Sequence, residues 1–410
     1  MKPIVQRSVF SASIQPEFSN TRCQTGNSLW NGNQRGREKR MIWLGAEGQF
    51  GAKANPDALG TSGLPAAAFE WSYGDDAVMV GKHMGAMRIL VTGGAGFIGS
   101  RLARRLLADG HAVVIVDNLF TGHRQNVPVG AQLVEGDIGQ EATLAALPDG
   151  PFDAVCHLAA QSSGAVSMEQ PLYDIQTNAV STLLLIRWCE KRRVRRFLYA
   201  SSMAVYGNPA AVPVDENAPV SPVSYYGVSK LASEHLLRVA GNSWVRPTAL
   251  RMFNVYGPGQ NLANLRQGMA SIYLAYLLKG QEVPVTGSLE RFRDFVYIDD
   301  VVDAWARVLQ QPDTPSLAYN IGSGRPTQVR ELLRLLIETC GLPSDHPVRT
   351  LSAPPGDQFG LYANVERAAA ELGWKAQTPL AEGIRRMVEW AGCQEGKPRA
   401  AGGRATAKLP

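Results

Sequence analysis

Three glycines spaced three residues apart are the clearest sign of chemistry in this chain. Gly93, Gly96 and Gly99 come directly after the apolar run 88–92, and a helical pattern follows them. In such a loop the first glycine allows a tight turn, the second leaves room for a pyrophosphate, and the third lets the helix pack closely on the strand. The N-terminus of the helix then faces the phosphates. The loop therefore predicts a dinucleotide-binding site.

An acid at the end of the next apolar run bears on which dinucleotide is bound. Asp117 ends the run 111–117 and lies 21 residues after Gly96. A carboxylate at this place accepts hydrogen bonds from ribose hydroxyls and repels a 2′-phosphate. Asn118 adds no positive charge, although Arg124 lies further along the chain and could approach the ribose. The pattern therefore favours NAD over NADP.

A tyrosine and a lysine four residues apart could transfer a proton. Tyr226 and Lys230 open a helical pattern, and the four-residue step places both on one helix face. An ammonium within about 4–6 Å favours the phenolate, and the positive charge of an oxidised nicotinamide acts in the same direction. We therefore expect Tyr226 to act as a general acid and base near neutral pH, and Lys230 also to bind the nicotinamide ribose.

Two serines at the end of another apolar run could assist this tyrosine. Ser201 and Ser202 follow the run 196–200. Parallel sheets bind ligands at the C-terminal ends of their strands, so both hydroxyls are expected in the crevice. A hydroxyl there stabilises negative charge on a substrate oxygen.

The composition argues against several classes of protein. The chain has 410 residues, 45% of them hydrophobic, and a formal net charge of +5, so it can bury a large core and offers no electrostatic case for nucleic acid. The basic cluster 191–196 ends a helical pattern, where cations favour the helix dipole. The five cysteines have no CxxC spacing and predict neither a disulfide framework nor a metal site. No apolar run reaches the ~18 residues that span a membrane, and we expect a cytoplasmic protein.

Alternating strands and helices must position these residues. The sequence predicts strands at 88–92, 111–116, 131–134, 153–157, 196–200 and 245–251. Helical patterns lie near 97–109, 140–147, 171–192 and 225–240, and later near 264–279, 299–310, 328–340, 365–372 and 380–392. This order predicts an α/β fold with a doubly wound parallel sheet, the Rossmann arrangement, and a smaller C-terminal α/β lobe for the substrate.

The chain divides into four expected regions. Residues 1–86 show no periodicity and no secretory signal, so we expect a disordered extension or a true start at Met87. Residues 87–255 are expected to form the NAD-binding core with the catalytic residues. Residues 256–393 should form mainly the substrate lobe, with some strands returning to the core. Residues 394–410 are expected to be a disordered tail.

Ten motifs lie in order within residues 87–393, about three quarters of the chain. They are TGGAGFIG (92–99), VDNL (116–119), EGDI (135–138), HLAAQ (157–161), NAVST (178–182), YASSMAVYG (199–207), YYGVSK (225–230), RMFNVYGPGQ (251–260), RDFVYIDD (293–300) and YNIGSG (319–324). Together they resemble the extended short-chain dehydrogenase/reductases, in particular the NAD-dependent nucleotide-sugar epimerase/dehydratase group of the UDP-glucose 4-epimerase type.

This resemblance implies a role for each matching residue. The catalytic residues would be Ser202 (rather than Ser201), Tyr226 and Lys230. The NAD-binding residues would be Gly93, Gly96, Phe97, Ile98, Gly99, Asp117, Asn118, Asp137, Ile138, Ala159, Ala160 and Lys230. The substrate-binding residues would be Ser163, Asn254, Arg293 and Asp357. A guanidinium suits a diphosphate because it binds two oxygens at once. The resemblance also implies a homodimer formed by the helices at 171–192 and 225–240.

Some positions depart from the pattern of the family. Pro354 stands where many epimerases of this group have a phosphate-binding arginine, which leaves the nucleotide open. Leu361 matches a position that limits the substituent at C2 of the sugar, and its size fits either a hydroxyl or an acetamido group. Ser162 and Ser163 replace basic or bulky residues of some relatives, which indicates a different sugar pocket.

The residues after the catalytic hydroxyl distinguish between reactions. Dehydratases of the family have Asp-Glu there and decarboxylating relatives a Glu, whereas this chain has Met203 and Ala204. Neither side chain can transfer a proton. The prediction is therefore a 4-epimerase that oxidises C4 of a UDP- or dTDP-hexose transiently, with surface-polysaccharide precursors as its expected products. A nucleotide-sugar dehydrogenase or reductase with net NAD(H) turnover and a non-catalytic NAD-binding regulator stay as alternatives.

Overall fold

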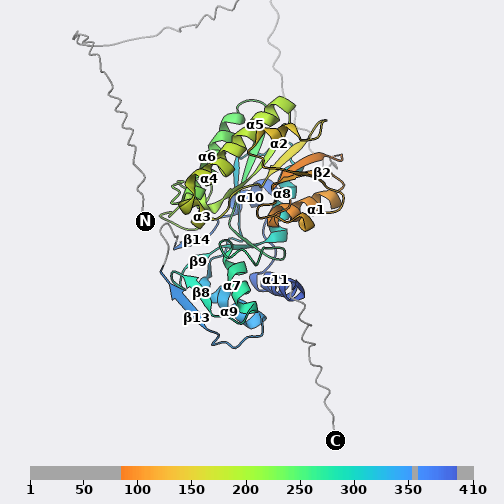
Figure 1. Ribbon diagram of the computed structural model, residues 1–410. Coiled ribbons are helices and arrows are strands. Elements are labelled where there is room, and N and C mark those ends of the chain that lie inside the picture. The colour runs from red at the N-terminus through yellow and green to blue at the C-terminus, as the bar shows by residue number, and fades with distance from the viewer. Residues whose placement is uncertain (1–84, 353–358, 395–410) are drawn as a thin grey trace, which may run out of the picture. The chain divides into compact units, whose positions relative to one another are not determined.

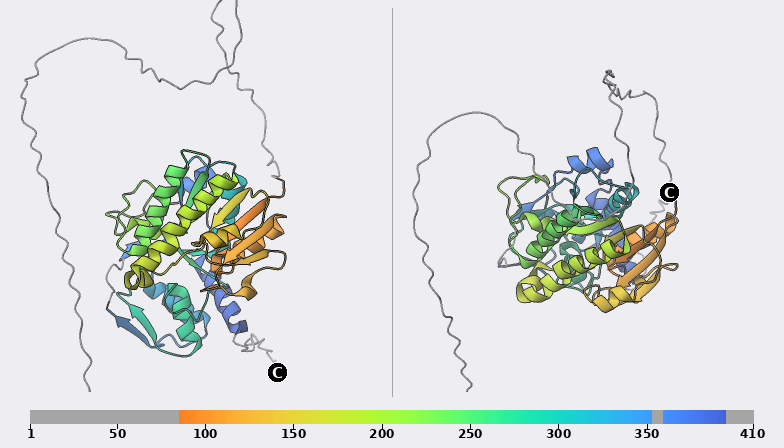
Figure 2. Two further views of the ribbon diagram at one scale, coloured as in Figure 1. Left: turned by 45° about the horizontal axis from the view of Figure 1, so that its top comes forward. Right: turned by 90° about the horizontal axis from the view of Figure 1, so that it is seen from above.

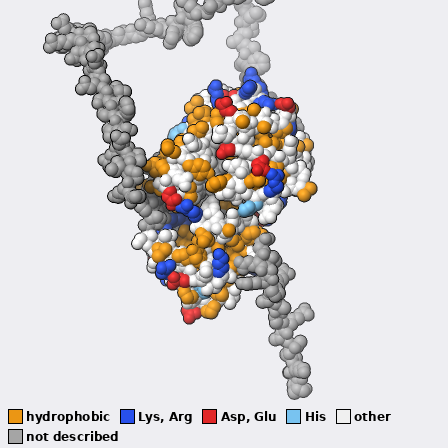
Figure 3. Space-filling view, viewed as in Figure 1, with side chains coloured by type: hydrophobic (Ala, Val, Ile, Leu, Met, Phe, Trp, Pro, Cys, Tyr) orange, Lys and Arg blue, Asp and Glu red, His pale blue; other side chains and the backbone are white. Residues whose placement is uncertain are grey.

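The computed structural model describes residues 85–352 and 359–394. Residues 1–84 of the expected extension and 395–410 of the expected tail, together with Pro354 and Asp357, lie outside these described residues. Cationic and anionic side chains are interspersed on the face drawn in Figure 3. Every helix in the described part of the chain is too short or too polar to cross a membrane.

Seven parallel strands form the central sheet, in the order β11–β6–β5–β4–β1–β2–β3. The strands are β1 (Arg88–Thr92), β2 (Ala112–Asp117), β3 (Gln132–Glu135), β4 (Ala154–His157), β5 (Arg196–Ser202), β6 (Arg246–Met252) and β11 (Ala318–Ile321). The chain crosses from one side of β1 to the other between β3 and β4, which creates a switch point where such sheets bind ligands. The predicted doubly wound parallel sheet is confirmed.

Helices cover both faces of this sheet (Figure 2). Ile89 and Val91 of β1 pack in one core with α1 (Phe97–Ala108) and α8 (Ile298–Gln310). Leu90 points the other way, into a core with α5 (Ser181–Arg192) and α6 (Tyr225–Ala240). Burial on both faces explains why β1 is a continuous apolar run rather than an alternating one. The short α2 (Glu141–Ala145) packs on the same side as α5.

The predicted helix at 171–192 is interrupted. It consists of α4 (Pro171–Ile175), a π-helical segment η2 (Gln176–Val180) and α5. A further helix, α3 (Gly164–Glu169), precedes it and was not predicted. π-helical turns frequently lie at functional sites. Two 3₁₀ turns complete this half, η1 (Arg124–Asn126) and η3 (Met203–Tyr206).

The C-terminal part forms a smaller α/β lobe beside the sheet (Figure 1). Its elements are β7 (Asn254–Tyr256), α7 (Met269–Leu278), β8 (Val283–Thr286), β9 (Phe292–Arg293), β10 (Phe295–Tyr297), β12 (Thr327–Gln328), α9 (Val329–Thr339), β13 (Val348–Leu351), β14 (Gly360–Leu361) and α11 (Leu380–Gln394). Helix α10 (Glu366–Leu372) packs instead against β11 and α8. Strand β8 pairs with β13, β7 with β10, and β9 lies between β12 and β14. Strand β11 pairs with β6 in the central sheet.

The helix predicted from residue 264 begins only at Met269. Gly268 has a φ of +86°, outside the helical region. The side chains of Asn261 and Asn264 accept hydrogen bonds from the backbone two residues further on. Such local hydrogen bonds compete with helix formation. Residues 260–268 are therefore a loop, and this loop reaches the cavity described next.

Candidate active site

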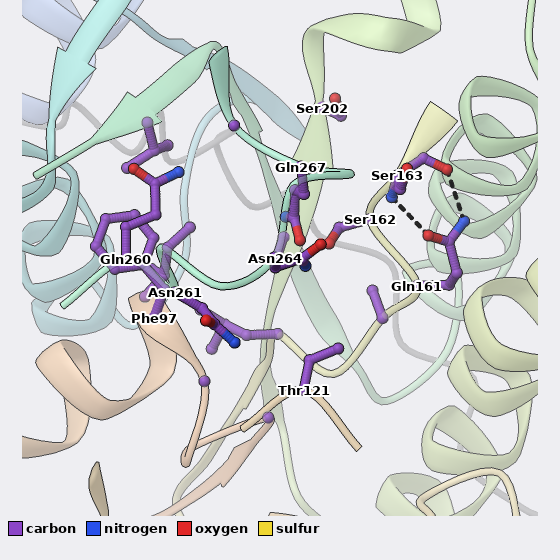
Figure 4. A pocket seen from close by; sticks show the side chains of 18 of the residues that line it. Phe97, Thr121, Gln161, Ser162, Ser163, Ser202, Gln260, Asn261, Asn264 and Gln267 are labelled. Carbon is purple, nitrogen blue, oxygen red and sulfur yellow. Dashed lines mark hydrogen bonds between the residues drawn. The ribbon is translucent and has the colours of Figure 1, made fainter. Parts of the chain in front are cut away.

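All predicted site residues that the structure describes line one cavity of about 1850 Å³. They come from loops at the C-terminal ends of β1, β2, β3, β4, β5 and β6, from α6 and from β9. Figure 4 shows part of the wall, with Phe97, Thr121, Ser162 and Ser202 around one space. Asp357 is the one predicted site residue outside the described part of the chain.

The glycine-rich loop has the geometry that its spacing predicts. Gly93 has a φ of +70°, and a Cβ there would lie 2.7 Å from the backbone nitrogen of Ala159. A Cβ at Gly99 would collide with the carbonyl oxygen of Gly93. At Gly96 a Cβ would meet only that same oxygen, at 3.2 Å, so the backbone of the loop is open toward the cavity. Gly93 thus makes the tight turn, Gly96 leaves the backbone open, and Gly99 allows close packing of the helix.

Asp117 connects the glycine-rich loop to the loop after β2. Its carboxylate accepts hydrogen bonds from the backbone of Ala95 at 2.9 Å and Leu119 at 2.8 Å. Asp117 is buried and lines the cavity. Arg124, which could have favoured a 2′-phosphate, forms an ion pair with Glu135. The arrangement around Asp117 therefore keeps the features that favour NAD.

The other predicted cofactor residues form the rest of this wall. Asp137 accepts a hydrogen bond from the backbone of Gly139 at 2.8 Å, and Ile138 is buried. The hydroxyl of Thr92 holds the loop after β4 by accepting from the backbone of Leu158 and Ala159 at 3.2 and 3.1 Å. Phe97, Ile98, Asn118 and Ala160 complete the set at the cavity surface.

These residues fit NAD. The loop offers open backbone at the N-terminus of α1, where an anionic pyrophosphate is stabilised. Asp117 offers carboxylate oxygens beside it, and the neighbouring arginine is already paired. Asp137 and Ile138 lie at the end of β3, next to β2 in the sheet.

Helix α6 presents Tyr226 and Lys230 to the cavity. Its N-terminus is capped by Ser224, whose hydroxyl accepts from the backbone of Gly227 at 3.1 Å. A Cβ at Gly227 would lie 2.5 Å from the carbonyl oxygen of Ala204, so the glycine lets α6 approach η3 closely. The ammonium of Lys230 is 5.8 Å from the centroid of the Tyr226 ring. It donates to the carbonyl of Ala200 at 2.9 Å and is buried.

The surroundings of Tyr226 act on its pKa in both directions. Burial raises it to about 12, a hydrogen bond with Ser202 acts in the opposite direction, and the negative charge of Asp174 raises it further. Burial also lowers the pKa of Lys230 to about 8. The expectation of a Tyr226 that works near neutral pH includes the charge of an oxidised nicotinamide, so it stays a prediction for the NAD-loaded protein. A cationic nicotinamide in the cavity acts in the direction of a lower pKa.

The two serines at the end of β5 have different partners. The hydroxyl of Ser201 donates to the carboxylate of Glu234 at 2.5 Å, which also pairs with Arg251 at 2.7 Å. Ser202 accepts a hydrogen bond from the backbone of Ala204 at 3.2 Å. It also forms a side-chain hydrogen bond with Tyr226. Because successive side chains of a strand point to opposite faces, only Ser202 joins the tyrosine. The position of the two serines at the end of one strand did not distinguish them, whereas their hydrogen-bond partners in the structure do.

The predicted substrate residues come from the loop after β4, from β7 and from β9. Arg293 is buried and donates to the carbonyls of Phe292 and Phe359 at 2.9 and 3.1 Å. The amide of Asn254 donates to the carbonyl of Asp294 at 3.1 Å. Ser163 caps α3 and donates to the carbonyl of Arg266 at 2.8 Å.

Leu361 was expected beside the substituent at C2 of the sugar, but it lies behind the cavity wall. It is fully buried in a cluster with Val205, Tyr206 and Phe253, and it is absent from the described wall of the cavity. Strand β14 places it opposite Arg293, so its bulk acts on the packing behind that arginine.

Two groups of residues at the site were not predicted. The loop 260–268 brings Asn264 and Gln267 beside Ser162 (Figure 4). A buried network joins Gln161, Asp174, Asn178 and Ser229. The loop was not predicted because its sequence has a helical pattern. The buried network could have been found from the sequence, since Asn178 opens the motif NAVST and Asp174 precedes it by one helical turn.

Comparisons with known proteins agree with this site. The model of the NAD dependent epimerase/dehydratase family matches residues 89–322. The chain is 36% identical over 314 residues to a UDP-glucose 4-epimerase of Mycolicibacterium smegmatis, covering 74% of this chain and 98% of that protein.

Solved structures give the same result. The UDP-glucose 4-epimerase of Thermotoga maritima with UDP-glucose has a TM-score of 0.71 and 34% identity, covering 75% of this chain and 100% of that one. The UDP-glucose 4-epimerase of Thermus thermophilus in complex with NAD has a TM-score of 0.68 and 36% identity, covering 74% of this chain and 98% of that one. The family that the ten motifs predicted is confirmed: the chain belongs to the NAD-dependent epimerase/dehydratase family.

Proposed function

We propose that the protein is an NAD-dependent nucleotide-sugar 4-epimerase that oxidises C4 of a UDP- or dTDP-hexose transiently. The observation that carries this proposal is the joint lining of one cavity by the glycine-rich loop and by Ser202, Tyr226 and Lys230. Bound NAD⁺ supplies a hydride acceptor for the oxidation and the same hydride for the reduction.

Tyr226 is the residue that moves the proton of the sugar 4-hydroxyl. Its phenolic oxygen takes the proton as C4 is oxidised and gives it back as C4 is reduced. Ser202 hydrogen-bonds the same sugar oxygen and stabilises the charge that develops on it. Lys230 favours the phenolate by its positive charge. One acid–base residue is sufficient because the reduction at C4 reverses the oxidation and returns the proton to the same oxygen.

The diphosphate must stay bound while the 4-keto sugar turns over. Arg293 and Asn254 are the residues that we assign to it. The hydrogen bonds from Arg293 to the carbonyls of Phe292 and Phe359 orient its guanidinium at the cavity wall. An anchored diphosphate lets the sugar present its second face without leaving the site.

The residues of η3 argue against elimination of water. Met203 and Ala204 follow Ser202 there, and neither has a group that can exchange a proton. Removal of water across C5 and C6 needs such a group in addition to Tyr226. Simple return of the hydride needs none.

The test is NMR of the purified protein with UDP- and dTDP-hexoses and the corresponding N-acetylhexosamines, with no cofactor added. We expect one of them to form its C4 epimer, which also identifies the sugar and the nucleotide. NADH formation that depends on added NAD⁺, without an epimer, would indicate a net dehydrogenase instead. Binding of NAD without any conversion would indicate a regulator.

We also propose that the protein is a homodimer formed by α4, η2, α5 and α6. These segments expose Leu172, Val180, Leu183, Val228 and Val239, of which Val239 is 70% exposed. Apolar side chains gathered on adjacent helices mark an interaction surface. Light scattering should give twice the mass of the chain, and Val239→Lys should shift the mass toward one copy. A monomeric wild-type protein would exclude this interface.

We place the enzyme in the cytoplasm, supplying sugar precursors for surface polysaccharides. The buried free thiols of Cys156 and Cys189 fit a reducing compartment. The pathway rests on the family alone. Loss of the gene in the native host should deplete one C4 epimer from the surface polysaccharide, and an unchanged sugar composition would exclude this role.

A further inference from the structure

Asp174 is a fully buried carboxylate that the proposed reaction does not use. It lies on α4, directly before the π-helical segment, and packs against α6. One oxygen accepts from the amide of Gln161 at 2.6 Å and from the amide of Asn178 at 3.2 Å. The other accepts from the hydroxyl of Ser229 at 2.6 Å. Three elements therefore converge on one side chain.

The partners of Asp174 fit an ionised carboxylate. Gln161 and Asn178 direct N–H groups at it. An amide N–H is a hydrogen-bond donor only, so it cannot accept a hydrogen bond from a protonated carboxyl group. Burial raises the pKa of Asp174, while the hydrogen bonds and the charge of Lys230 act in the opposite direction. Because an uncompensated buried charge is costly, the negative charge requires a nearby cation.

Lys230 is the cation whose charge acts on Asp174, without a direct ion pair between them among the described contacts. Its own contacts are the carbonyl of Ala200, at 2.9 Å, and the rings of Tyr199 and Tyr226, whose centroids lie 5.0 and 5.8 Å from the ammonium. None of these three groups carries a full negative charge at neutral pH. Asp174 is the charge that favours the protonated form of Lys230.

Two other carboxylates near α6 in the described part of the chain are already paired. Glu234 pairs with Arg251 at 2.7 Å, and Glu169 pairs with Arg266. His157 is neutral, since burial and the charge of Lys230 lower its pKa to about 3. The electrostatic balance of Lys230 therefore depends on Asp174.

Ser229 connects Asp174 mechanically to the catalytic turn. It directly precedes Lys230, and its hydroxyl also lies 3.0 Å from the carbonyl oxygen of Tyr226. The amide of Asn178 donates to the same hydroxyl at 3.0 Å. Through Gln161, whose backbone nitrogen donates to Asn178 at 2.9 Å, the network also holds the loop after β4 at the cofactor side of the cavity.

We propose that Asp174 is a positioning residue and the buried counter-ion of the Tyr226–Lys230 pair, holding the first turn of α6 through Ser229 and keeping Lys230 charged. This inference rests on the proposed function. It predicts that Asp174 sets the pH range of the enzyme, since its negative charge opposes loss of a proton from both Tyr226 and Lys230.

Asp174→Asn removes the charge with little change of shape. The amide oxygen can accept from Gln161 and Asn178, and the new NH₂ can donate to the hydroxyl oxygen of Ser229. The hydrogen of that hydroxyl still reaches the carbonyl of Tyr226. Asp174→Ser removes the same charge with a smaller side chain, and it replaces the asparagine variant if that variant does not fold.

The expected result is a shift of the whole pH profile of kcat toward acid, by about one pH unit. In the NAD-loaded enzyme the charge of the nicotinamide lowers the pKa of Tyr226, so the acid limb follows Tyr226 and the alkaline limb follows Lys230. Both groups lose their protons more easily without Asp174. The control Ser229→Ala removes a hydrogen bond and keeps the charge, so it should lower kcat without moving the profile. Asp174→Glu should restore the wild-type limbs.

Two results would overturn the proposal: an asparagine variant with a lower kcat and unmoved limbs, and one with unchanged kcat and profile. A turnover-independent readout separates this from failure of the proposed function. Ultraviolet difference titration of the NAD-loaded protein, corrected with Tyr226→Phe, measures ionisation of Tyr226 without substrate. An inactive wild-type protein refutes the epimerase, while an unshifted tyrosine titration in Asp174→Asn refutes the counter-ion.

Discussion

Replacing Tyr226 with phenylalanine removes the proposed proton carrier and little else. The ring keeps its place in the first turn of α6, and the ammonium of Lys230 still lies near it. The variant loses one hydroxyl and its hydrogen bond with Ser202. A hydrogen bond of this kind contributes ~1 kcal/mol to stability. The free energy of unfolding should therefore change by no more than about that amount.

The loss of activity should be much larger. General acid–base catalysis by a positioned side chain contributes about 10²–10⁴-fold, which is about 2.7–5.4 kcal/mol of activation free energy. The rate of C4 epimerisation, followed by NMR, should fall by such a factor. The content of bound NAD should stay at the wild-type level, because the glycine-rich loop is untouched.

Tyr225→Phe is the matched control. Tyr225 precedes the catalytic tyrosine on the same helix, is 45% exposed and lies outside the described wall of the cavity. The same atom is deleted one residue away, and activity should not change. Wild-type turnover by Tyr226→Phe, or an equal loss in both variants, would refute the assignment of Tyr226.

Three further perturbations test the frame of the site. Gly99→Ala places a Cβ against the carbonyl oxygen of Gly93, so the purified variant should lose bound NAD and melt at a lower temperature; retention of both would contradict this packing. Glu234→Gln breaks the buried pair with Arg251 and should lower the free energy of unfolding in urea by about 3–5 kcal/mol, whereas a loss below about 1 kcal/mol would show that the pair is replaceable. Burial lowers the pKa of Lys230 from 10.5 to about 8. The unfolded chain binds more protons than the folded one between these values, so stability should rise across pH 8–10.5, by about 3 kcal/mol at most. Lys230→Met should lack this rise, and parallel curves for the two proteins would contradict the lowered pKa.

The catalytic helix could be predicted from the sequence to its end residues. The pattern at 225–240 agrees with the observed bounds of α6 because a serine cap, a regular apolar stripe and a following glycine all point to the same ends. The sheet was predictable for a similar reason. Long apolar runs separated by helical patterns leave few alternatives to a parallel sheet.

The helix predicted from residue 264 shows where local hydrogen bonds outweigh helical periodicity, and the pKa of Tyr226 shows what only the fold reveals. Residues 264–268 have helical periodicity, but Gly268 and the side-chain hydrogen bonds of Asn261 and Asn264 keep them in a loop. The pKa of Tyr226 depends on its burial and on Asp174, a residue 52 positions earlier in the chain. Spacing along α6 cannot reveal this burial or the charge of Asp174, because both come from elements that meet only in the fold.

Retention of a label at C4 tests the central claim most directly. A nucleotide hexose with deuterium at C4 is incubated with the purified protein without added NAD, and the product is analysed by NMR. Return of the same hydride to the opposite face predicts a C4 epimer that keeps its deuterium at C4. Loss of the deuterium to water or to released NADH, or absence of the epimer, would contradict transient oxidation at C4.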